Sequence, residues 1–223
     1  MLIPFLLGAV LLAAFSGLLW QNRAAFRQRR ATRAAYFDEA APLFQSLIRR
    51  VEPSGFARLS GAWNGLRFDL QAVPDTLTFR KLPTLWVMVT LTEKVAVAGE
   101  VHVMMRPTGS EIFSHYGLMP DGVALPAGYP TDCALRCEDT SRLPLTVIAD
   151  EAALFQDRCV KELVVAQSGL RIVLLGEEAE RGRYLLYRDA EMGMRPFAAA
   201  RLTPVLKRLT AMHDRLNKEA AHG

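Results

Sequence analysis

An uncharged apolar run from Leu2 to Trp20 constrains this chain more than any other feature of its sequence. Ser16 is its one conventional polar side chain, and Pro4 falls in the first helical turn, where its missing N–H costs no hydrogen bond. A helix needs about 20 apolar residues to cross the hydrocarbon core of a bilayer. The run therefore predicts a single N-terminal transmembrane helix, with the anchor over residues 1–22.

Basic residues follow the apolar run directly and predict its orientation. A cleaved signal peptide, the alternative, would carry its basic residues before the apolar core. An excess of Arg and Lys after a span marks the cytoplasmic flank. We therefore expect the N-terminus to face out of a bacterial-type inner membrane, with the rest of the chain on the cytoplasmic side. The basic residues of the juxtamembrane helix 23–35, which set the topology and face lipid headgroups, are Arg23, Arg27, Arg29, Arg30 and Arg33.

The same five arginines explain the charge of the chain. With 27 basic and 23 acidic residues the formal net charge is +4, and without these arginines the remainder is close to neutral. A basic chain would otherwise suggest a nucleic-acid partner. Here the excess lies beside the predicted span, so membrane lipids are the expected partner and nucleic acid is not.

Small residues recur every four positions within the apolar run, at Ala9, Ala13 and Gly17. Such a stripe lets a second helix approach closely inside a membrane. It predicts an integral-membrane or membrane-associated protein as a further partner.

The remaining residues, 36–223, predict one cytoplasmic α+β domain with an antiparallel-rich sheet and flanking helices. Asn64-Gly65 between two alternating runs is a strong hairpin signal, because both turn positions require positive φ. Residues 84–92 are apolar on both faces and predict a central strand. Other alternating or β-branched runs predict the strands 57–63, 66–73, 99–106, 133–138, 159–166, 170–175 and 182–189.

Apolar positions at three- and four-residue steps predict helices around these strands. The first extends over residues 37–51 and ends before Pro53. A short helix is expected near residues 145–156. The last begins at Thr203-Pro204, a capping side chain followed by a first-turn proline, and we expect a helical segment over 196–202 before it.

The predicted core combines apolar residues from most of these elements. Residues 64–70 also resemble residues 168–174, which admits an origin of the domain in two related halves. The expected core residues are Phe68, Leu70, Val87, Val89, Val103, Leu163, Ile172, Leu174, Leu185 and Leu209.

The longest predicted loop, residues 107–132, is rich in proline and glycine. A loop of this length in a compact domain is either functional or mobile. A histidine oriented by a carboxylate is a common general base, which leaves an enzyme as an alternative. The side chains that make this segment the candidate binding loop are Glu111, His115, Tyr116 and Tyr129.

The sequence shows none of the common catalytic, phosphate-binding or paired metal-ligand spacings. Cys133, Cys137 and Cys159 are predicted to be free thiols in a reducing compartment. We predict no catalytic residue, cofactor or metal, and expect an accessory, assembly or scaffold subunit of an inner-membrane complex that acts through protein–protein contacts. The alternative is a membrane-tethered enzyme or lipid-binding protein that acts through residues 107–132.

Overall fold

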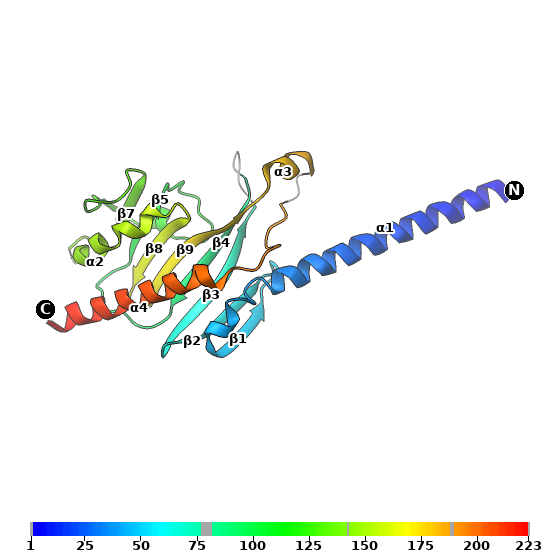
Figure 1. Ribbon diagram of the computed structural model, residues 1–223. Helices are drawn as coiled ribbons and strands as arrows, with labels where there is room; N and C mark the ends of the chain where they lie inside the picture. Colours follow the sequence, from blue (N-terminus) through cyan, green and yellow to red (C-terminus); the bar gives the residue numbers. More distant parts are fainter. Residues whose placement is uncertain (1, 77–81, 142, 188–189, 223) are drawn as a thin grey trace.

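The fold combines a long N-terminal helix, an antiparallel sheet and helices packed on the sheet (Figure 1). The computed structural model describes residues 2–76, 82–141, 143–187 and 190–222, and the side chains of residues 2–5, 121, 183, 187 and 222 lie outside this description. A mixed helical and antiparallel-sheet architecture, as predicted, is therefore confirmed.

Nine strands of the described chain form one open sheet with the order β1-β2-β3-β4-β9-β8-β5-β7-β6. Each of their pairings is antiparallel. The strands are β1 (Gln45–Val51), β2 (Ala57–Trp63), β3 (Leu66–Asp75), β4 (Thr84–Leu91), β5 (Val101–Met105), β6 (Asp121–Val123), β7 (Cys133–Cys137), β8 (Val160–Ala166) and β9 (Gly169–Glu178).

The predicted hairpin and central strand are both present. Asn64 and Gly65 join β2 to β3 with φ angles of 49° and 81°, as the turn requires. β4 lies inside the sheet between β3 and β9. Residues 64–70 and 168–174 each cover a turn and the start of a strand that pairs with β4, and the relation between two halves stays a prediction.

Helix α4 (Ala199–His222) covers one face of the sheet along β4 and β9 (Figure 1). Every second residue of the strands packs beneath it, because successive side chains of a strand point to opposite faces. Nine of the ten predicted core residues are buried in this layer. The exception is Leu185, which is 57% exposed.

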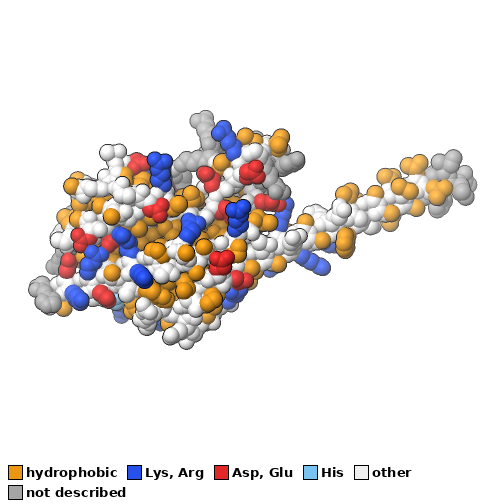
Figure 2. Space-filling model, in the orientation of Figure 1, with side chains coloured by type: hydrophobic (Ala, Val, Ile, Leu, Met, Phe, Trp, Pro, Cys, Tyr) orange, Lys and Arg blue, Asp and Glu red, His pale blue; other side chains and the backbone are white. Residues whose placement is uncertain are grey.

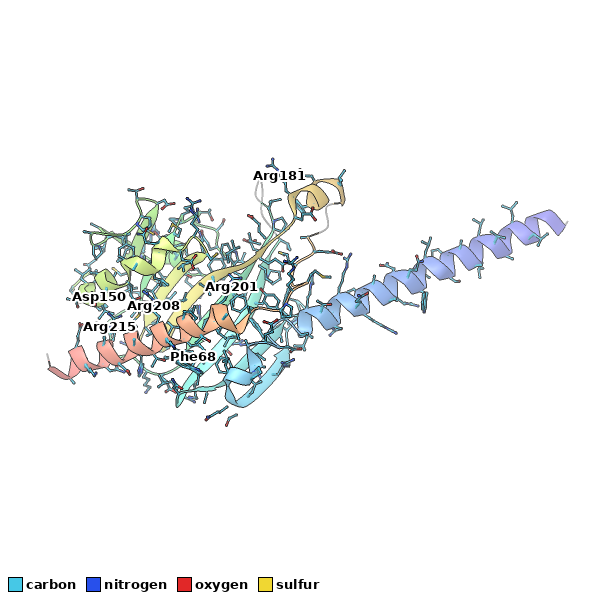
Figure 3. All side chains as sticks on the ribbon, viewed as in Figure 1. Phe68, Asp150, Arg181, Arg201, Arg208 and Arg215 are labelled. Atoms are coloured by element: carbon cyan, nitrogen blue, oxygen red, sulfur yellow. The ribbon has the colours of Figure 1, made fainter. Side chains whose placement is uncertain are left out.

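Short helices complete the layer around α4. They are the 3₁₀ turns η1 (Ala41–Leu43), η2 (Tyr116–Leu118) and η3 (Ala152–Gln156), with the helices α2 (Leu145–Asp150) and α3 (Arg181–Tyr187). Ion pairs link the end of α2 to α4: Arg215 Nη1 lies 2.8 Å from Asp150 Oδ2, and Arg208 Nη1 lies 2.8 Å from Oε2 of Glu151, the residue after α2. Figure 3 labels Asp150 beside Arg208 and Arg215.

The predicted helix over residues 37–51 is wrong. Phe37 and Phe44 are buried as expected, but Phe37 lies in a turn and Phe44 directly follows η1. The chain then enters the edge strand β1. Pro42 disfavours a continuous helix, since it lacks an N–H and restricts the residue before it. Ile48, which the helical pattern placed on the buried stripe, is 58% exposed.

Two predicted boundaries in the C-terminal part are also wrong. Residues 181–187 form α3 rather than a strand, and residues 188–189 of that predicted strand lie outside the described residues. Thr203 does not cap a helix, because α4 already begins at Ala199 and the Thr203 hydroxyl donates to the Ala199 carbonyl at 3.0 Å. The expected segment over 196–202 is in part the first turn of α4.

Helix α1 (Leu2–Ala34) joins the predicted anchor and the juxtamembrane helix without a break and projects away from the domain (Figure 1). Apolar side chains follow one another along its projecting part (Figure 2). Over the described residues we find no helix with a stretch long and apolar enough for a membrane span. Residues 2–5 of the predicted span have side chains outside that description.

The base of α1 is built into the domain. Arg33 Nη1 donates to the Ser54 carbonyl at 3.2 Å, and the same guanidinium lies 5.3 Å from the centre of the Phe56 ring. Tyr36 and Phe37, directly after the helix, are buried in the core. No flexible linker therefore separates α1 from the sheet.

Candidate functional site

The face of the sheet opposite α4 is the candidate functional surface. Along β4, Val87 and Val89 point to the α4 side, whereas Trp86, Met88 and Thr90 point to the other. The segment from Phe113 to Leu118 covers part of this second face over β5 and β8. Phe113 also packs on Trp86 of β4, and the described chain leaves the face open over β2, β3 and the part of β4 and β9 around Thr90 and Arg171.

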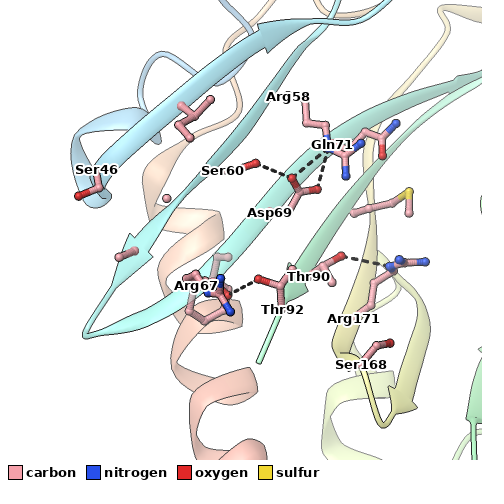
Figure 4. A pocket seen from close by; sticks show the side chains of 15 residues that line it. Ser46, Arg58, Ser60, Arg67, Asp69, Gln71, Thr90, Thr92, Ser168 and Arg171 are labelled. Atoms are coloured by element: carbon pink, nitrogen blue, oxygen red, sulfur yellow. Dashed lines mark hydrogen bonds and ion pairs between the residues drawn. The ribbon is translucent and has the colours of Figure 1, made fainter. Parts of the chain in front are cut away.

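A row of polar side chains crosses the open part of this face (Figure 4). Ser60, Asp69, Thr90 and Arg171 are direct cross-strand partners on β2, β3, β4 and β9. The Ser60 hydroxyl donates to Asp69 Oδ1 at 2.7 Å, and Arg171 Nε donates to the Thr90 hydroxyl at 3.1 Å. Three strand spacings of about 4.8 Å make this row roughly 14 Å long.

Arginines dominate the charge of the hollow around this row, which has a volume of ≈ 650 Å³. Arg58 Nε donates to both oxygens of Asp69, at 2.9 and 3.0 Å. These hydrogen bonds raise the pKa of Arg58. Arg67 at the rim bonds Glu93 at 3.1 Å. Arg171 uses its Nε toward Thr90, so its terminal amino groups remain to meet an anionic group.

A buried ionic cluster lies on the same face under the loop. His102 of β5 and Glu162 of β8 are 2% and 0% exposed. His102 Nδ1 lies 2.8 Å from Glu162 Oε1, and His102 Nε2 lies 2.7 Å from Glu100 Oε1. The Ser114 hydroxyl from the loop also donates to Glu162 Oε1. Two carboxylate acceptors favour the imidazolium, because only that form donates from both nitrogens.

The protonation of His102 follows from two opposed effects. Burial lowers its pKa, but the hydrogen bonds and charges of Glu162 and Glu100 outweigh burial, so the pKa is raised above its ordinary value of 6.5. Glu162 Oε2 is buried and finds no hydrogen-bond partner among the described residues. The cluster therefore holds a charged histidine between two acids.

A second pair fixes the start of the loop. Lys161 Nζ donates to the carbonyls of Met105 and Arg106, each at 2.8 Å, and to Glu111 Oε1 at 3.2 Å. The Thr108 amide donates to the same Glu111 oxygen at 2.6 Å. Burial raises the pKa of Glu111, but Thr108 and Lys161 together hold it below its ordinary value.

The structure disperses the four side chains of the predicted binding loop. Glu111 pairs with Lys161 on the sheet, and His115 is exposed. Tyr116 is buried with the Arg136 guanidinium 5.3 Å from its ring centre. The Tyr129 hydroxyl donates to a carbonyl of α2 at 2.6 Å. Tyr116 and Tyr129 line one hollow of ≈ 640 Å³, whereas Glu111 lines a different cavity of ≈ 900 Å³.

The other predicted site residues lie on α1. Arg29 and Arg33 contact the domain, through Glu191 and Ser54 respectively. The remaining members of the basic segment and of the small-residue stripe are exposed on the helix: Arg23, Arg27, Arg30, Ala9, Ala13 and Gly17. Their proposed roles toward lipid and a second helix stay predictions.

Sequence reasoning missed the polar row and the His102 cluster. A usable signal was the pair Lys161-Glu162 inside an otherwise apolar strand, since acids are almost never fully buried unless paired. For the row, the signal was the alternation of Arg58 and Ser60 with apolar neighbours. Searches with family models, curated proteins and solved structures give no match for this chain.

Proposed function

We propose that this chain is a membrane-anchored scaffold or accessory subunit that docks a partner protein on the open face of its sheet, on the cytoplasmic side of an inner membrane. The observation that carries the proposal is α1, a helix with exposed apolar side chains along its N-terminal part that is joined without a linker to a folded domain. The large apolar side chains that it leaves exposed between residues 6 and 20 are Leu6, Leu7, Val10, Leu11, Leu12, Phe15, Leu18, Leu19 and Trp20.

The distribution of these side chains favours lipid as their surroundings. At about 100° per residue they lie on all sides of the helix, and the widest gap between them is about 80°, so one packed helix would hide only part of this surface. Ala9 lies in that gap, whereas Ala13 and Gly17 share their side of the helix with Trp20 and Leu6. Lipid around most of the helix, with a partner helix on the side of Ala9, would cover the apolar surface.

The open sheet face suits a protein partner. It combines the partly apolar floor at Met88 with polar groups of Asp69, Thr90 and Arg171 on rigid strands. Interfaces of this kind use Arg near their centre and polar groups at their rim. A rigid stalk keeps this face at a fixed distance from the membrane, so even weak contacts suffice through effective concentration.

Photo-crosslinking in cells tests the docking face on the full chain. A photoreactive residue in place of Gln71, inside the hollow, should trap a discrete partner, and one in place of the exposed Lys207 on α4 is the matched control. The variant Arg171→Glu should abolish the crosslink from position 71. Equal crosslinking from positions 71 and 207, or no effect of Arg171→Glu, would contradict the proposal.

Exchange of the span tests the anchor. The chain should resist extraction by alkaline carbonate, and a reporter after Gly223 should be active only in the cytoplasm. Replacing residues 2–20 by an unrelated transmembrane helix should preserve the partner crosslink if α1 is a tether alone. Loss of the crosslink would assign a specific contact to Ala9, Ala13 and Gly17, and a chain released by carbonate would refute the anchor.

The alternative, an enzyme or lipid-binding protein acting through the 107–132 loop, draws support from the cavity of ≈ 900 Å³ beside Glu111. Trp86, Ile112 and Phe113 give it an apolar wall. Such walls suit acyl chains, so we would measure the thermal stability of the detergent-purified chain with added fatty acid. A rise in midpoint that Ile112→Glu removes would favour this function.

A further inference from the structure

The side of the domain from which α1 projects also carries the short helix α3 (Figure 1). Two adjacent leucines on α3 are exposed, Leu185 by 57% and Leu186 by 77%. Met194, in the return from α3 to α4, is 45% exposed and lies near Glu180 at the start of α3. Exposed apolar side chains gathered in this way mark an interaction surface.

Contacts with the base of α1 fix the position of this apolar surface along the axis of α1. Arg29 Nη2 lies 2.9 Å from Glu191 Oε1, and the Phe197 amide donates to the Tyr36 carbonyl at 2.7 Å. The return segment after α3 is thus held beside the last turns of α1.

The predicted membrane surface lies within reach of α3. Arg29 follows Trp20 by about 13 Å along the helix axis, at 1.5 Å per residue. A headgroup layer roughly 5–7 Å thick takes up part of that distance. Glu191 is held at the level of Arg29, and α3 lies on the side of the domain from which α1 projects, so α3 lies close to the expected level of the headgroups (Figure 1).

We propose that α3 rests on the bilayer surface and inserts Leu185 and Leu186 at the boundary between headgroups and acyl chains. This inference rests on the membrane anchor of the proposed function. Arg181 at the outer side of α3 (Figure 3) is accompanied by exposed Glu178 and Glu180. Because these charges are mixed, apolar contact with the lipid, rather than attraction to charged headgroups, holds α3 on the membrane. Binding of α3 therefore needs no anionic lipid.

The second contact has a consequence for the docking face. A single spanning helix leaves the domain free to tilt relative to the bilayer. Contact through both α1 and α3 restricts that tilt, so the open face of the sheet keeps one angle to the membrane plane.

Depth measurements on a nitroxide label test the proposal with the full chain in phosphatidylcholine nanodiscs. The label is attached at Leu186→Cys, with Leu118→Cys as the control, because Leu118 is 80% exposed in η2. The strands β5 and β7, which come before and after η2 in the chain, lie on the side of the domain away from α1 (Figure 1). Labelled parent chain gives the background from Cys133 and Cys159. At position 186 relaxation by oxygen should exceed relaxation by a water-soluble nickel chelate, and at position 118 the order should reverse.

The outcomes separate this inference from the anchor. Carbonate extraction of the same samples reports whether α1 spans the bilayer. An inserted α1 with position 186 as accessible to nickel as position 118 would overturn the α3 contact alone, whereas a chain released by carbonate would overturn both. Leu185→Glu with Leu186→Glu should keep the chain inserted but move a label at Met194→Cys into water. If that label stays in lipid, the leucines do not hold α3.

Discussion

Replacing Glu162 by glutamine tests whether the buried cluster ties the 107–118 loop to the sheet. Glu162 is fully buried, and its Oε1 accepts from both His102 and Ser114. Glutamine keeps the shape and one acceptor but removes the charge that pairs with the imidazolium. Breaking a buried ion pair costs about 3–5 kcal/mol, and the retained acceptor places Glu162→Gln near the lower end, at about 3 kcal/mol. For a domain of this size the melting temperature should fall by roughly 6–12 °C.

Circular dichroism melts of the full chain in detergent measure this effect. Glu93→Gln is the matched control, because Glu93 pairs with Arg67 at 3.1 Å on the surface and should cost less than about 1 kcal/mol. A fall for Glu162→Gln no larger than that for Glu93→Gln would refute the reasoning.

The pH dependence provides a second check with a defined sign. The folded pKa of His102 is raised above 6.5, so its stabilisation is full below that pH and is lost as pH rises through the folded pKa. In Glu162→Gln the imidazolium keeps only Glu100 as its partner. The stability gap between parent and variant should therefore narrow as the pH rises above about 6.5. A gap that widens would contradict the assignment of a charged histidine.

Three further substitutions probe the layers of the fold in denaturant unfolding. Leu209→Ala should lower stability by about 2–5 kcal/mol, because Leu209 is fully buried on α4, and a change below about 1 kcal/mol would contradict its place in the core. Gly169→Ala should cost about 2 kcal/mol or more, since φ is 149° and a Cβ would lie 2.1 Å from the Leu91 carbonyl oxygen. Tyr129→Phe should cost about 1 kcal/mol through the lost bond to Ile148, and an unchanged midpoint would show that this bond contributes nothing.

The parts of the fold that the sequence predicted have local causes. The Asn64-Gly65 turn, the alternation in β3 and the apolar stripe of α4 are each determined within a short stretch of chain. The helix over 37–51 failed because Phe37 and Phe44 satisfy a helical spacing while packing from turns. Pro42 is a local signal against a continuous helix, but the strand over residues 45–51 depends on the pairing of β1 with β2, which no local pattern encodes.

α3 illustrates the reverse error. Tyr184 to Tyr187 have the aromatic and aliphatic composition of a strand, yet β9 already ends at Glu178 and the described chain offers 181–187 no strand partner. A strand without a neighbour leaves its amides unpaired, whereas a helix satisfies them internally. The need to pair the backbone amides therefore outweighs the strand propensity of these residues, and Leu185 lies at the surface.

The candidate site could not be predicted because its partners meet only through strand register. His102 and Glu162 are 60 positions apart and come together because β5 pairs with β8. In the same way, Asp69 reaches Arg171 only through Thr90 on the strand between them. A shift of one residue in any of these pairings would turn the charged groups to the α4 side.

Register also explains why the open part of the face, rather than the long loop, is the better binding surface. Over β5 and β8 the loop excludes water, so the ionisable groups there must be paired inside the fold, as His102, Glu162 and Lys161 are. Over β2, β3 and the part of β4 around Thr90 the described chain leaves the sheet uncovered, and Arg171 lines the hollow there. A partner that binds at the open part needs only to displace water. A partner that binds at the loop must first break the hydrogen bonds that pair these groups. The loss of stability in Glu162→Gln measures how strong they are.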